Sequence, residues 1–149
     1  MKSLFTSEAY NEIKERMDQL NEHAEAKWGR MNVSQMLRHC SFPLQVALQD
    51  IQLDKPNIFK RVLFSMFKSS LYDDKPWKQN LPTAKQFIVN DKKDYKVEKA
   101  RLIENINRFH NEKSRSSWPA HPLFGEFTQE QWGKMQYKHL DHHLKQFGV

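Results

Sequence analysis

The chain has 149 residues, of which 38% are hydrophobic and 28% are charged. This length fits a single domain over residues 1–149, and the balance of apolar and charged residues excludes a disordered chain. The formal net charge is +6, but basic residues are spread along the chain and alternate with acidic ones. We therefore expect a solvated basic surface and no nucleic-acid partner.

The expected location is the cytoplasm. The first five residues turn polar at once and contain no apolar signal core. No segment approaches the roughly 18 consecutive apolar residues of a membrane span, so no membrane partner is expected. The only cysteine, Cys40, excludes an intrachain disulfide and suits a reducing compartment, where it is expected to act as a small buried apolar residue.

The first two predicted helices cover residues 7–27 and 33–51. In the first, apolar residues recur at steps of three to four with charges between them, and the helix is expected to stop before Gly29. The second has a continuous apolar stripe with Pro43 inside it. Because proline has no N–H for the helical hydrogen bonds, Pro43 is expected to kink or split this helix.

A shorter apolar helix is predicted over residues 57–71, followed by a turn-rich, irregular stretch at 73–82. The third main helix is predicted over residues 94–111, and a loop at 114–125 follows it. Five residues of the third main helix are expected to face inward: Val97, Ala100, Ile103, Ile106 and Phe109.

The last predicted helix starts at Thr128 and stops at Gly148. Thr128 with Gln131, like Asn32 with Gln35 before the second helix, has the pattern of a capping box. No segment shows the alternating pattern of a strand. Four principal helices, one extra short helix and two long loops predict an all-α fold, in the form of a four-helix bundle.

The last helix carries the clearest functional signal, His139 and His143 at a spacing of four residues. Side chains at this spacing share one helical face, and two imidazoles placed in this way can bind one metal ion. Such pairs also occur on surfaces and in hydrogen-bonded interiors, so spacing alone leaves both interpretations open. Both histidines fall on the same side of the helix as Trp132 and Met135, whereas His142 lies nearer the edge.

A third ligand has to come from another segment, and the best candidate is His39 in the second helix. Spacing does not exclude His23, His110 or His121 as alternatives, although His121, beside Pro122, is more typical of a loop residue with a local hydrogen bond. Neutral imidazole suits zinc, nickel, copper or iron. Three protein ligands with one open position are the pattern of a catalytic zinc site.

Two segments of the chain resemble the DinB/YfiT-like superfamily. Residues 31–39 read Met-Asn-Val-Ser-Gln-Met-Leu-Arg-His, and residues 139–146 read His-Leu-Asp-His-His-Leu-Lys-Gln. The stretch His-Pro-Leu-Phe-Gly at residues 121–125, followed by Trp-Gly at 132–133, is similar to one bacterial subfamily. The resemblance covers most of the chain in helix order.

The resemblance implies an up-down-down-up four-helix bundle that holds a divalent metal ion, zinc or nickel, through His39, His139 and His143. It thereby selects His39 over its competitors. The closing motif of the family continues with Arg-Gly-Gln after the double histidine, whereas this chain keeps Gln146 without the arginine. His142 and Gln146 are the candidates for contacts to a metal ligand or to the substrate from the rim of the site.

Characterised members of the superfamily include thiol-dependent S-transferases and a mycothiol-dependent isomerase. They imply a metal-dependent enzyme, often a homodimer, that transfers a low-molecular-weight thiol to an electrophilic small molecule. Metal-assisted hydrolysis at the same site is the first alternative, but Asp141 is expected to point away and no other carboxylate neighbours the ligands as a general base. A non-catalytic metal-binding or stress-related protein is the second alternative.

Overall fold

The computed structural model describes residues 1–54 and 56–149, without the side chains of residues 58, 60 and 61. Within these residues the protein is all-helical, which confirms the predicted class; the only β-type pairing is an isolated bridge. The α-helices are α1 (Ser7–Gln19), α2 (Val33–Ala47), α3 (Ile58–Met66), α4 (Tyr95–Asn111) and α5 (Gln129–Gln146). Short 3₁₀ helices lie at η1 (Lys68–Leu71), η2 (Lys85–Phe87) and η3 (Glu112–Ser114).

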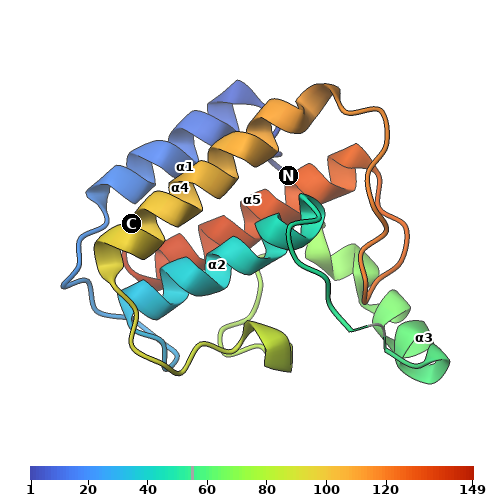
Figure 1. The fold of residues 1–149 in the computed structure, drawn as a ribbon, viewed down its shortest axis with the longest axis horizontal. Coiled ribbons are helices and arrows are strands. Elements are labelled where there is room, and N and C mark those ends of the chain that lie inside the picture. Colours follow the sequence, from blue (N-terminus) through green and yellow to red (C-terminus); the bar gives the residue numbers. More distant parts are fainter. Residues whose placement is uncertain (55) are drawn as a thin grey trace.

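The four longest helices lie side by side, and α3 projects away from them at one end (Figure 1). Helix α2 packs against α4 and α5, and α1 packs against the same two helices from the other side. The core between them is filled by large side chains that are almost fully inaccessible to solvent, among them Trp132, Phe109, Met17, Leu37 and Leu140. No helix in the described part of the chain has both the length and the apolar character needed to cross a membrane.

Both predicted capping boxes are present. The Asn32 side chain accepts a hydrogen bond from the backbone N–H of Gln35 at 2.9 Å, and the Gln35 side chain accepts one from the Asn32 N–H at 3.0 Å. Thr128 and Gln131 make the same reciprocal pair at the start of α5, at 3.2 and 3.1 Å. These contacts satisfy N–H groups that have no partner inside the helix, so they fix where α2 and α5 begin.

Helix α1 ends at Gln19, and the predicted extension to residue 27 is wrong. The backbone turns at Asn21, whose side chain accepts a hydrogen bond from the N–H of His23 at 2.9 Å. Such a local side-chain bond competes with the helical hydrogen bonds. The carbonyl of Leu20 is also held from α4, which fixes the end of α1 against the core. The segment that follows α1 therefore leaves the axis of the helix and passes the end of α5.

Helix α2 continues through Pro43, so the predicted split does not occur. The carbonyl of this proline accepts a hydrogen bond at 2.9 Å from the buried side chain of Gln136 in α5, which ties the two helices together. The helix ends at Ala47, before the predicted end at residue 51, because Gln49 adopts a left-handed backbone conformation with φ of 65°.

The inward face of α4 differs from the predicted one. Ile106 and Phe109 are buried as expected, but Val97 is 53% exposed, and Ala100 is exposed as well. The buried positions of the helix are Glu98, Leu102, Asn105, Ile106, Phe109 and His110. The carboxylate of Glu98 is paired with Arg101 at 2.5 Å, which makes its burial tolerable. The apolar spacing therefore predicted the second half of the inward face and failed in the first turns of the helix, where Glu98 faces the core in place of Val97 and Ala100.

Gly133 provides a test of how tightly the N-terminal segment packs on α5. A Cβ atom at this position would collide with the hydroxyl of Ser3 and lie 2.5 Å from the ring of Phe5, which is itself stacked on Phe109 at 4.6 Å. Helix propensity alone would make Gly133→Ala stabilising by about 1 kcal/mol. We expect the collision to reverse the sign and cost about 1–3 kcal/mol in urea unfolding followed by circular dichroism. An alanine variant as stable as the wild type would contradict this packing.

Candidate metal centre

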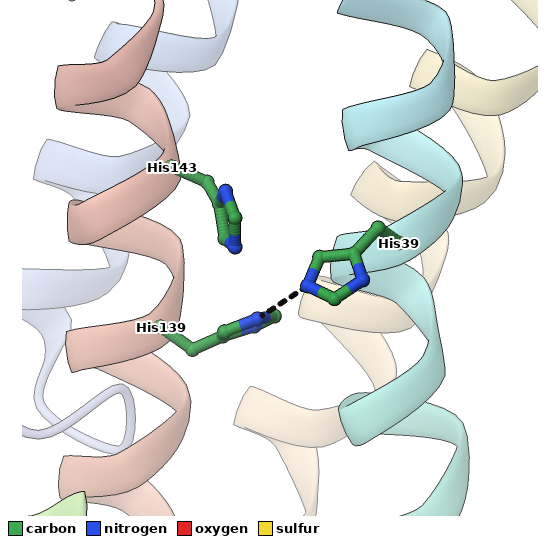
Figure 2. Close-up of side chains that lie close together, drawn as sticks. All are labelled: His39, His139 and His143. Carbon is green, nitrogen blue, oxygen red and sulfur yellow. Dashed lines mark hydrogen bonds between the residues drawn. The ribbon is translucent and has the colours of Figure 1, made fainter. Parts of the chain in front are cut away.

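Three histidines from two helices meet in the space between α2 and α5. His39 projects from the middle of α2, and His139 and His143 project toward it from successive turns of α5 (Figure 2). One ring nitrogen of each can be chosen so that all three atoms lie within 4.8 Å of one another. The Nε2 atoms of His39 and His139 are 3.1 Å apart. All three side chains are buried.

The distance between the Nε2 atoms of His39 and His139 is close to the one expected when two imidazoles bind the same metal ion. Imidazole nitrogens bound to zinc lie about 2.0–2.1 Å from the metal, so two of them in a tetrahedral site are about 3.3 Å apart. The contact between His39 and His139 already has nearly this spacing. The widest nitrogen separation, up to 4.8 Å, requires a small closing movement of one ring.

Hydrogen bonds to the far side of two rings orient their nitrogens. The Nδ1–H of His39 donates to the carbonyl of Phe87 at 3.0 Å, and the Nδ1–H of His143 donates to the side-chain oxygen of Gln146 at 2.8 Å. Because these oxygens can only accept, each neutral ring keeps its lone pair on Nε2, the nitrogen that faces the cluster. Partners of this kind are what fixes the tautomer of metal-binding histidines.

Gln146 is itself held in place. Its amide nitrogen donates to the carbonyl of Trp28 at 2.6 Å, so the amide oxygen must turn toward His143. The same amide nitrogen lies 2.6 Å from where a Cβ atom at Gly29 would be, and Gly29 has φ of 84°. A side chain at Gly29 would therefore both strain the backbone and displace Gln146.

His139 lacks such a partner. Its Nδ1 is buried and has no hydrogen-bond partner among the described residues. Since the lone pair of His39 faces it, the 3.1 Å contact requires the proton of His139 to sit on Nε2. Among the described residues, the hydrogen-bonding contact of this ring is therefore to another imidazole, and the convergence of the two nitrogens is also compatible with a shared cation.

Burial keeps the three imidazoles neutral. It lowers the pKa of His39, lowers that of His139 well below its usual value and lowers the pKa of His143 to about 3. The proximity of the other rings acts in the same direction for His139 and His143, because a second positive charge is unfavourable there. Neutral imidazole is the form that binds metal.

The other two predicted site residues, His142 and Gln146, lie next to the three-histidine cluster and are not part of it. His142 is half-buried and lies beside the cluster, with its ring 5.6 Å from that of Trp28 and 5.8 Å from that of Trp77. Gln146 contacts His143 as described above. His23 is on the surface, and the Nδ1–H of His110 donates to the carbonyl of Leu4 elsewhere in the core, so neither competes with His39.

The cluster forms part of the wall of a cavity of about 1290 Å³. The rest of the cavity wall is mostly apolar and comes mainly from the irregular segments that connect the helices. The aromatic part of the lining consists of Trp28, Trp77, Phe64, Phe87 and Phe124. Apolar walls with a few polar groups converging on one point are typical of sites for small molecules.

His121 also lines this cavity, which its sequence context did not reveal. The predicted local hydrogen bond is present, since Nδ1 accepts from the N–H of Leu123 at 3.1 Å. This bond places the proton of the neutral ring on Nε2, which has no hydrogen-bond partner within the described residues. Burial lowers the pKa of His121 to about 4, so the ring offers the cavity a neutral N–H donor.

Lys138 is a second residue that the sequence did not single out. Its buried ammonium group donates to the carbonyls of Ser70 and Asp73 at 2.8 and 3.0 Å and to the Asp73 carboxylate at 2.6 Å. It therefore pins the irregular segment that carries Trp77, whose ring lies 5.7 Å from the ammonium nitrogen. The neighbouring Asp141 points away from the cavity, as expected, and pairs with Arg16 at 2.8 Å.

Gln146 is the most informative position to change. Gln146→Ala removes the acceptor of the His143 Nδ1–H, and loss of such a partner typically weakens metal binding by about 10–100-fold. We expect this loss for zinc in competition with a chromogenic chelator. Gln146→Glu keeps an acceptor for His143 and should bind more tightly than the alanine variant.

Lys145→Ala, next to Gln146 on the exposed side of α5, serves as the matched control and should leave zinc affinity unchanged. Equal zinc affinity in Gln146→Ala and Lys145→Ala would show that the hydrogen bond to His143 does not orient a metal ligand.

A family model described as "Protein of unknown function (DUF1569)" matches residues 2–148. The match includes all three clustered histidines, Gln146 and His121. No curated protein and no solved structure matches the chain.

Proposed function

The chain belongs to the DUF1569 family, and for it we propose the function of a metal-dependent enzyme that transfers a low-molecular-weight thiol to an electrophilic small molecule. His39, His139 and His143 would hold one divalent ion, zinc or nickel, through their Nε2 atoms. The observation that carries the proposal is the buried cluster of these histidines in a cavity wall, with two lone pairs aimed by Phe87 and Gln146.

The size of the cavity supports a reaction between two small molecules. At about 1290 Å³ it exceeds the range of roughly 300–1,000 Å³ that is usual for a site holding one ligand. A divalent ion at the three histidines would supply a Lewis acid that favours the thiolate form of a bound thiol at neutral pH. The second reactant then has room beside it against the apolar wall.

The residues of the chain have separate tasks in this proposal. Trp28 and Trp77 shield the histidines from bulk water and pack against an apolar substrate. His121 donates its Nε2–H to an acceptor group of the electrophile. Lys138 holds the segment of Trp77 in position through Asp73.

We also propose that the chain is a single-domain member of the DinB/YfiT-like superfamily, with α1, α2, α4 and α5 as an up-down-down-up four-helix bundle. The side-by-side arrangement of these four helices supports it, as does the origin of the histidines from the second and the last of them (Figure 1).

Hydrolysis has less support at this site. A metal-assisted hydrolase uses a general base near the metal, most often a carboxylate or a histidine. Among the described residues that line the cavity, Asp73 is the one carboxylate, and it is bound to Lys138. Asp141 is bound to Arg16 outside the cavity. The candidates for a general base that remain in the cavity wall are therefore two histidines outside the cluster, His121 and His142.

Metal analysis tests the site directly. Protein purified without a histidine tag should contain about one zinc or nickel ion per chain, the stoichiometry of a single three-histidine site. His139→Ala should lose the metal, because only two ligands remain, and His142→Ala should retain it. Retention of metal by His139→Ala, or loss of it from His142→Ala, would contradict the ligand assignment.

Activity is tested with monobromobimane and chlorodinitrobenzene as electrophiles and a panel of low-molecular-weight thiols. Metal-loaded wild type should accelerate conjugation with at least one thiol, and both the chelated protein and His139→Ala should fall to the uncatalysed rate. If no thiol gives metal-dependent turnover with either electrophile, the transferase proposal is wrong, even where metal is bound.

A further inference from the structure

Helix α3 presents an apolar face to solvent. Four of its residues and the one that follows form this face, here called the outer face, and each is more than half exposed, from 53% for Leu63 to 83% for Phe59. Its described members are Phe59, Val62, Leu63, Met66 and Phe67. These side chains follow the spacing of a single helical stripe. Figure 1 shows that α3 projects beyond the four packed helices, in agreement with the exposure of this stripe.

Contacts on the opposite side of α3 fix the orientation in which this helix presents the outer face to solvent. On the opposite side of α3, Phe64 is partly buried, lines the cavity and lies 5.8 Å from the ring of Phe124. Just beyond the helix, the ammonium group of Lys68 binds the carbonyl of Glu126 and lies 4.9 Å from the ring of Phe127. These contacts anchor one side of α3 to the protein, which leaves the apolar side turned outward.

The charge of this segment is entirely basic. Residues 55–72 contain four lysine or arginine residues and no aspartate or glutamate. The rest of the chain mixes the two signs. An exposed apolar stripe within a segment of uniformly positive charge is the pattern of a helix that lies in the interface of an anionic membrane.

A second copy of the chain fits the outer face less well. In a two-fold dimer the same patch meets itself, so two basic segments would be brought together without an acidic residue in either.

We propose that α3 docks this protein on anionic lipid surfaces, with the outer face inserted at the boundary between headgroups and acyl chains. With nine residues, α3 is about 13.5 Å long, so it can lie in the interface but cannot span the bilayer. Because Phe64 lines the cavity from the same helix, docking brings the cavity close to the lipid. The proposal does not depend on a bound metal.

The test is cosedimentation of the full-length protein with two kinds of vesicle. One kind is pure phosphatidylcholine, and the other contains roughly 30% phosphatidylglycerol, which supplies the negative surface potential. We expect wild type to bind the second kind at least about tenfold more strongly than the first, and raising the salt concentration to about 0.5 M should weaken this binding by screening.

The double variant Phe59→Ser with Met66→Ser should lose at least about tenfold of this binding, since binding strength scales with the buried apolar area. Both side chains are largely exposed, so the variant is expected to fold normally. The matched control, Ile88→Ser with Val97→Ser, removes two exposed apolar side chains from other elements and should bind as wild type does.

Absence of wild-type binding to the anionic vesicles would overturn the proposal, as would undiminished binding by the Phe59→Ser, Met66→Ser variant. The same two proteins are compared by sedimentation velocity. A wild-type dimer that this variant converts to a monomer would assign the outer face to a second copy of the chain and would also overturn the proposal.

Discussion

The candidate site depends on the contact between α2 and α5, and two pairs of buried polar groups lie within that contact. Gln136 donates across it to the carbonyl of Pro43, and His39 meets His139 one helical turn away. Buried polar groups without partners are costly, so these pairs restrict how the two helices can slide or rotate against each other. The register that satisfies them is also the one that brings three Nε2 atoms together.

Hydrogen bonds at His143 and His39 connect both helices to the irregular segments that line the cavity. Gln146, in the last turn of α5, joins His143 to the carbonyl of Trp28 in the segment after α1. Phe87 joins His39 to the segment before α4 through its backbone carbonyl. The groups that orient the imidazoles therefore belong to the irregular segments that supply the aromatic wall, as Phe87 does, or are held by them, as Gln146 is by Trp28, so the geometry of the histidine cluster and the shape of the cavity are linked.

Sequence patterns correctly predicted the features that depend only on residues close together in the chain. The caps at Asn32 and Thr128 and the shared face of His139 and His143 depend only on residues within a turn of each other. Spacing could not select His39, because its approach to α5 depends on the packing of helices a hundred residues apart. The end of α1 was missed for a related reason, since Tyr95 and Lys99 of α4 donate to the carbonyl of Leu20 there. The first turns of α4 were missed because Glu98, paired with Arg101, is buried where the apolar pattern placed Val97 inward.

The central claim is that His39, His139 and His143 bind one cation through Nε2. Long-range ¹H–¹⁵N correlation of the histidine rings, measured before and after addition of zinc, tests it most directly. The account predicts that zinc shifts the Nε2 resonances of these three residues and that the Nδ1 proton of His143 is already present in the metal-free protein. A shift of Nδ1 in place of Nε2, or a response from His142 and not from His39, would contradict it.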